Sequence, residues 1–130
     1  EGRTYDTKTP LSSIPPLFGN FFLSYQNHKA EFQLGYEFNA AKKVQDYNLE
    51  EGIDNLSQTP VIDKEATEDR YKYAGTPSWE TFNLSVHFEM NLNTTFLFQV
   101  DNIFDKHYKE FASGISAPGR NFSATLNYLF

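Results

Sequence analysis

Apolar side chains recur at every second position in five stretches of the chain. The clearest stretch is residues 30–40, where apolar and polar or small residues alternate over eleven positions. A β-strand points successive side chains to opposite faces, so each stretch predicts a strand with one apolar face and one polar face. The first stretch is the least regular, because Phe18 and Phe22 fall on its polar face. The strands are expected at about residues 17–26, 30–40, 79–91, 94–104 and 119–130.

Strand length and loop length both favour a membrane barrel. Strands of soluble proteins have roughly five or six residues, whereas a tilted membrane strand needs roughly 9–11. Short connections at 27–29 and 91–93 alternate with longer ones at 41–77 and 105–118. Barrels of the outer membrane alternate short periplasmic turns with long outer loops in this way. We therefore expect an all-β fold, an antiparallel up-and-down meander of about five strands that forms part of a larger transmembrane barrel.

The alternation assigns a candidate environment to each face. The polar face is expected to line the lumen, and the apolar face to contact lipid. Aromatic residues near the strand ends fit the girdles that barrels place at the two membrane interfaces. The lumen-facing candidates are His87, Glu89, Gln99, Asp101 and Asn121. The lipid-facing residues are Phe32, Leu34, Tyr36, Phe38, Phe82, Leu84, Val86, Phe88, Met90, Phe96, Phe98 and Val100. The outer girdle is expected at Trp79, Phe82, Phe104, Tyr108 and Phe122, and the inner girdle at Tyr25, Phe88, Phe96, Tyr128 and Phe130.

Composition narrows the function classes. The net charge of -6 disfavours nucleic acid and a basic membrane-surface patch. The chain has no Cys and no run of 18 apolar residues, which excludes disulfides and a spanning helix. It begins at Glu1 without a signal peptide, which suggests a processed or excised piece. Eight acids between Val44 and Lys72 predict either an electronegative mouth for cationic ligands or an ordinary solvated loop.

Candidate chemistry is sparse. His28, His87 and His107 lie far apart in the sequence, so no shared metal site is expected. His87 and Glu89 could touch a plug or a substrate or simply keep the lumen polar, and Asp105 and Arg120 could pair to brace the last loop. We discern no combination of nucleophile, base and orienting group, so we expect neither an enzyme nor a bound cofactor.

Several segments of the chain resemble a known family, and two of them are sequence motifs. The segment Asn102-Ile103-Phe104-Asp105-Lys106-His107-Tyr108 resembles the NxFDKxY segment of TonB-dependent outer-membrane receptors. The segment Ser116-Ala117-Pro118-Gly119-Arg120-Asn121-Phe122 is similar to the PGRxF start of their final strand, and residues 11–18 resemble the start of an earlier strand. The alternating residues of the last stretch resemble the signal read by the barrel-assembly machinery. They are Phe122, Ala124, Leu126, Tyr128 and Phe130.

The resemblance implies a function and a set of partners. Members of this family have a 22-stranded barrel closed by an N-terminal plug, and they import iron complexes, haem, cobalamin or other scarce nutrients with energy from TonB. Residues 1–130 would then be the C-terminal barrel segment, without counterparts of the plug or the TonB-contacting box. The implied partners are outer-membrane lipid, the rest of the barrel and plug, the TonB complex and a small-molecule or metal-chelate ligand, in the outer membrane of a Gram-negative bacterium.

Two other readings remain open at the level of sequence. A soluble β-sandwich or small barrel that binds carbohydrate or lipid would explain the alternation but not the eleven-residue strand or the motifs. A plain diffusion porin would explain the strands but not the motifs. The transported substrate is not encoded in any pattern we identify.

Overall fold

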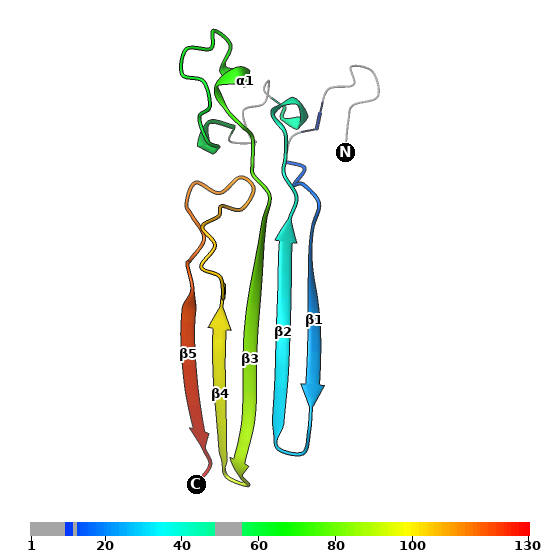
Figure 1. The fold of residues 1–130 in the computed structure, drawn as a ribbon, viewed down its shortest axis with the longest axis vertical. Coiled ribbons are helices and arrows are strands. Elements are labelled where there is room, and N and C mark those ends of the chain that lie inside the picture. The colour runs from blue at the N-terminus through cyan, green and yellow to red at the C-terminus, as the bar shows by residue number, and fades with distance from the viewer. Residues whose placement is uncertain (1–9, 12, 49–55) are drawn as a thin grey trace. The chain divides into compact units, whose positions relative to one another are not determined.

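The five expected strands form one sheet in the computed structural model, which describes residues 10–11, 13–48 and 56–130. The strand order is β1-β2-β3-β4-β5, so every strand lies beside its neighbour in sequence (Figure 1). The predicted all-β fold, an open antiparallel meander, is confirmed. The strands are β1 (Phe18–Gln26), β2 (Ala30–Asn39), β3 (Trp79–Asn91), β4 (Thr94–Asp101) and β5 (Asn121–Tyr128).

The last two strands are shorter than their predicted ranges of 94–104 and 119–130. Strand β4 ends at Asp101 because Asn102 adopts a positive φ of 50°, which turns the chain out of the strand. Strand β5 begins only at Asn121, because the Arg120 N–H bonds to the Asp105 side chain instead of a neighbouring strand. At the other end, Leu129 still donates its N–H to the Asn93 carbonyl after the regular strand has ended.

Both short turns are closed by an asparagine side chain. In the β1–β2 turn, the Asn27 Oδ1 accepts hydrogen bonds from the N–H groups of Lys29 and Ala30, each at 3.0 Å. In the β3–β4 turn, the Asn91 Oδ1 accepts a bond from the Asn93 N–H, also at 3.0 Å. Asparagine favours such turns because its side chain can bond to the backbone two residues further on.

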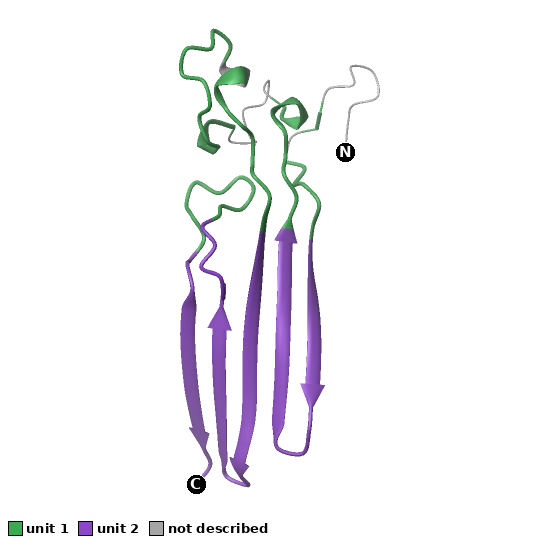
Figure 2. Cartoon of the chain, viewed as in Figure 1, with its two compact units in different colours: residues 1–18, 39–79, 108–117 green, residues 19–38, 80–107, 118–130 purple. Residues whose placement is uncertain are grey.

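The chain divides into two compact units, which we describe separately (Figure 2). The sheet unit comprises residues 19–38, 80–107 and 118–130. The loop unit comprises residues 1–18, 39–79 and 108–117.

Cross-strand register separates the two faces of the sheet unit. Val86 lies opposite Phe98, which lies opposite Ala124, and the next row on the other face is Ser85, Gln99 and Ser123. We call these the apolar face and the polar face. Register thus places the residues predicted to face lipid on β3 and β4 together on the apolar face, while their contact with lipid remains a prediction.

Two glycines of the β1–β2 hairpin lie beside aromatic rings. A Cβ on Gly19 would come within 2.9 Å of the Phe38 ring, and a Cβ on Gly35 would come within 3.2 Å of the Phe22 ring. Rings also pack along the apolar face, where Phe21 lies 6.3 Å from Tyr36 and Tyr36 lies 4.9 Å from Phe82. Phe22 interrupts the polar pattern of the first strand. Its ring lies beside Gly35, which has no side chain.

The loop unit contains short helical turns where the sequence predicted an irregular connection at 41–77. They are η1 (Val44–Asp46), η2 (Leu56–Gln58) and α1 (Asp69–Lys72), and part of the acidic run, at 49–55, lies outside the described residues. Isolated bridges pair Lys42 with Thr76 and Val61 with Tyr73. None of the helices in the described part of the chain has the length and apolarity needed to cross a membrane.

Candidate functional site

The two family-like motifs meet at a turn in the sheet unit, with Asn102 at its centre. Asn102 is only 4% exposed, and its amide Nδ2 donates to the carbonyls of Lys106, at 2.9 Å, and Pro118, at 3.2 Å. Its Oδ1 accepts a bond from the Lys106 N–H, and its own N–H donates to the Asn83 side chain. A buried side chain with these partners ties the start of the 102–120 connection to its end.

Asp105 and Arg120 are joined, but not through their two side chains. The Asp105 Oδ1 accepts a hydrogen bond from the backbone N–H of Arg120 at 2.8 Å. The Arg120 guanidinium donates instead to the Ile103 carbonyl at 3.4 Å and lies over the Phe122 ring. The predicted brace between residues 105 and 120 therefore exists as a hydrogen bond to the backbone rather than an ion pair.

The remaining motif residues contact aromatic partners. In the sheet unit, the Phe104 ring packs edge-on against Phe82 at 5.5 Å between ring centroids. In the loop unit, Tyr108 lies against Trp79 at 4.1 Å. These contacts show a packing role for both motif positions.

The polar face of the sheet unit is hollowed around His87. This hollow has a volume of about 370 Å³ and brings together residues from four strands. Its lining combines a carboxylate, an imidazole, amides and a hydroxyl, which can hydrogen-bond a polar solute. The lining residues are Glu31, Gln33, Ser85, His87, Leu97 and Asn127.

A second, smaller hollow of about 30 Å³ lies beside the β1–β2 turn. Its lining includes both His28 and His87, which are far apart in the sequence, together with Glu31 and Glu89. Sequence separation therefore understated how near these two histidines lie, since the β1–β2 turn lies beside β3. Even so, the described residues contain no cluster of three or more side chains suited to hold a metal ion.

The other predicted lumen-facing residues lie further along the polar face. Gln99 donates from Nε2 to the Asp101 Oδ1 at 2.8 Å, and Asp101 lies opposite Asn121 across β4 and β5. None of these three residues lines the hollow around His87. The sequence indicated the polar face but not which of its residues share a hollow, because that depends on register across β2, β3, β4 and β5.

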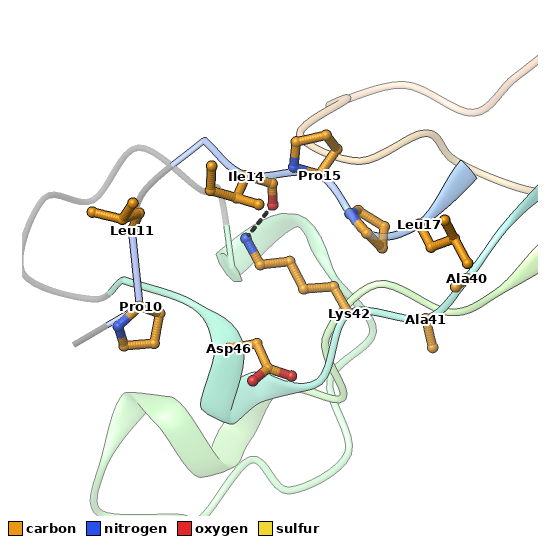
Figure 3. A pocket seen from close by; sticks show the side chains of 10 residues that line it. Pro10, Leu11, Ile14, Pro15, Leu17, Ala40, Ala41, Lys42 and Asp46 are labelled. Atoms are coloured by element: carbon orange, nitrogen blue, oxygen red, sulfur yellow. Dashed lines mark hydrogen bonds between the residues drawn. The ribbon is translucent and has the colours of Figure 1, made fainter. Parts of the chain in front are cut away.

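The loop unit has a pocket of its own, with a volume of about 430 Å³ (Figure 3). Its wall is mostly apolar, including Pro10, Ile14, Pro15 and Leu17, with Lys42 and Asp46 as the charged members. This size and character are those of small-molecule pockets. No pattern in the sequence predicts this pocket, because prolines and alanines in an aperiodic segment carry no recognisable motif.

Several contacts anchor the Lys42 side chain in the loop unit. It is 6% exposed, and its ammonium donates to the Ile14 carbonyl at 2.9 Å (Figure 3). The same Nζ lies 4.7 Å from the centre of the Tyr47 ring and 4.3 Å from that of Phe111. Tyr47, 1% exposed, bonds through its hydroxyl to that of Thr76 at 2.6 Å. These contacts join four separate segments into one small core.

The described strands form one open antiparallel meander with an apolar and a polar face, and this fold matches a fragment of a large outer-membrane β-barrel. Among solved structures, the chain is similar to "Copper transporter OprC", with a TM-score of 0.64 and 18% identity. The match covers 97% of this chain and 19% of that chain, so the chain spans about a fifth of that protein's length. At this identity the likeness shows the fold. No family model matches the chain, and no curated protein matches its sequence.

Proposed function

We propose that the chain is part of a TonB-dependent receptor of the bacterial outer membrane that imports a metal chelate, such as a siderophore, haem or cobalamin, or a similar nutrient. The observation that carries this proposal is the single open sheet with separated faces. A soluble β-sandwich buries one sheet against another. All five described strands instead belong to one layer, and strand residues as large as Phe21 are 65% exposed.

Two further observations support transport by this kind of receptor. The residues of both family-like motifs meet around Asn102 and Asp105, as expected if the motifs serve one turn. The structural neighbour is named a copper transporter, which agrees with import of a metal-containing solute. In this proposal the polar face contributes to the lumen, the plug and TonB act through other parts of the receptor, and the protein is not an enzyme.

The proposal assigns a role to each surface. The strands hydrogen-bond with those of the remaining barrel to form the wall, and the apolar face contacts outer-membrane lipid. The loop unit helps to capture the nutrient outside the cell, and the polar hollow around His87 lies along its path. The hollow offers hydrogen bonds without a fixed metal-ligand set, which suits a chelate that must be released again.

The test is uptake by cells that carry the full-length gene. We expect the protein in the outer-membrane fraction, and uptake of one metal chelate from a panel should stop when the proton gradient is collapsed. Loss of uptake in a strain without TonB is the specific result expected. Uptake that persists without the gradient would indicate a diffusion porin, and a protein found only in the soluble periplasm would contradict the proposal altogether.

A further inference from the structure

The apolar face carries charged side chains at one end only. Among the residues of the five strands, the only charged one in register with the apolar rows is Glu80, near the start of β3. Arg120, immediately before β5, joins this face because its guanidinium lies over the Phe122 ring at 5.9 Å. Both residues lie at the end of the sheet from which the longer connections leave.

The Arg120 side chain has unused hydrogen-bond donors. A guanidinium has five N–H groups, and here one nitrogen, Nη1, donates to the Ile103 carbonyl at a long 3.4 Å. No other hydrogen bond from this side chain reaches a described residue, and Arg120 is exposed. The group is therefore held in place by a ring and one carbonyl while most of its donors remain free.

Aromatic rings are exposed at the same end of the sheet as Arg120. Phe122 is 62% exposed and Phe104 is 74% exposed, and Phe104 packs against Phe82. Exposed aromatic rings at the end of a membrane strand mark the boundary between hydrocarbon and headgroups. An arginine that rises from such a girdle reaches the headgroup layer with its charged end.

We propose that Arg120 binds the phosphate of an anionic lipid headgroup at this end of the apolar face. The inference rests on the proposed function, because only a sheet embedded in a bilayer presents this face to lipid. A planar guanidinium forms two parallel hydrogen bonds with a phosphate, and its charge complements the lipid.

The Glu80 carboxylate does not pair with the Arg120 guanidinium. Its Oε2 accepts a hydrogen bond from the Tyr36 hydroxyl at 2.8 Å, on the β2 side of β3. Strand β4 lies between β3 and β5 in the sheet, and no ion pair joins Glu80 to Arg120, both of which the structure describes. The phosphate site is therefore assigned to the β4–β5 side alone.

The test compares two membranes. The full-length receptor is refolded into vesicles of phosphatidylcholine and into vesicles that also contain phosphatidylglycerol, and its unfolding by urea is followed. The wild-type protein should be more stable in the anionic vesicles, and Arg120→Gln should remove about a fivefold difference in the folded-to-unfolded ratio. Lys64→Gln, which removes an exposed charge in the loop unit, should keep that difference.

The outcomes separate a lipid site from a structural role. Loss of the Ile103 bond alone would lower the stability of Arg120→Gln equally in both membranes, and that result would overturn the inference. Arg120→Lys keeps the charge but cannot form the two parallel hydrogen bonds, so it should keep only part of the difference. If the receptor inserts but its stability does not depend on lipid charge, the lipid site alone is refuted. If it inserts into neither membrane, the proposed function is refuted as well.

Discussion

The Arg120 backbone N–H donates to the Asp105 carboxylate, with 2.8 Å between N and Oδ1. This bond connects the two motifs across a connection whose residues 108–117 belong to the other compact unit. It also explains the glycine that precedes Arg120, because a Cβ on Gly119 would lie 2.7 Å from the same Asp105 oxygen. The carboxylate occupies the space that any other side chain at position 119 would need.

Gly119→Ala should therefore destabilise the full-length protein. We expect a loss of about 1 kcal/mol, since the new methyl group displaces the carboxylate from its donor. Urea unfolding in vesicles measures it. In an Asp105→Ala background the same change should cost clearly less. Gly114→Ala is the matched control, because its Cβ would meet only the flexible Gln58 side chain, at 3.4 Å. Equal costs at positions 119 and 114 would contradict the explanation.

The two faces should respond differently to charge. Val86→Arg on the apolar face should cost roughly 2–4 kcal/mol in a membrane, because an arginine near mid-bilayer loses its hydration. Ser85→Arg, on the polar face opposite Gln99, should be nearly neutral. Refolding into vesicles at increasing urea gives both values. Similar costs for the two variants would overturn the assignment of the apolar face to lipid.

Lys42→Met should loosen the loop unit and leave the sheet unit unchanged. The variant keeps most of the apolar stem but loses the bond to Ile14 and the charge over Tyr47 and Phe111, at a cost of about 1 kcal/mol. Amide exchange should quicken at Thr76, whose N–H bonds to the Lys42 carbonyl. Exposed Lys43→Met is the control. Unchanged exchange at Thr76 would show that Lys42 is not what holds this unit together.

The last strand should be needed for assembly. Tyr128 and Phe130 pack edge to face at 5.2 Å, and both are strongly exposed. Changing both to Asp in the full-length protein should leave it unassembled in the periplasm. Heat-modifiable migration of the outer-membrane fraction on gels reports the folded barrel. Normal migration of the double variant would remove the assembly role proposed for these residues.

The isolated 130-residue chain should not be a monomer in water. Among the described residues, the buried apolar side chains are only Ala30, Tyr47 and Val100, so the sheet has almost no core of its own. Strands β1 and β5 also leave open edges that can pair with other chains. Light scattering in detergent-free buffer should show oligomers or aggregates. A folded, monodisperse monomer of 15.0 kDa would favour a soluble binding module instead.

The sequence predicted the strands well because alternation is a local property. Each residue from Phe82 to Met90 reveals its face by its position in the pattern, whatever lies beside it. The end of β4 was missed, because Asn102 has a backbone conformation that depends on contacts with Lys106 and Pro118. The meeting of His28 and His87 was missed for a similar reason, since it depends on how the β1–β2 turn lies beside β3.

The two glycine–ring contacts of the first hairpin favour one register of its two strands. Phe38 lies beside Gly19 and Phe22 lies beside Gly35, so each strand supplies one ring and one vacant position, on opposite sides of the sheet. If the hairpin slipped by two residues, both rings would meet a neighbour that carries a side chain. A hairpin in this wrong register would thus have two steric conflicts, one on each face of the sheet.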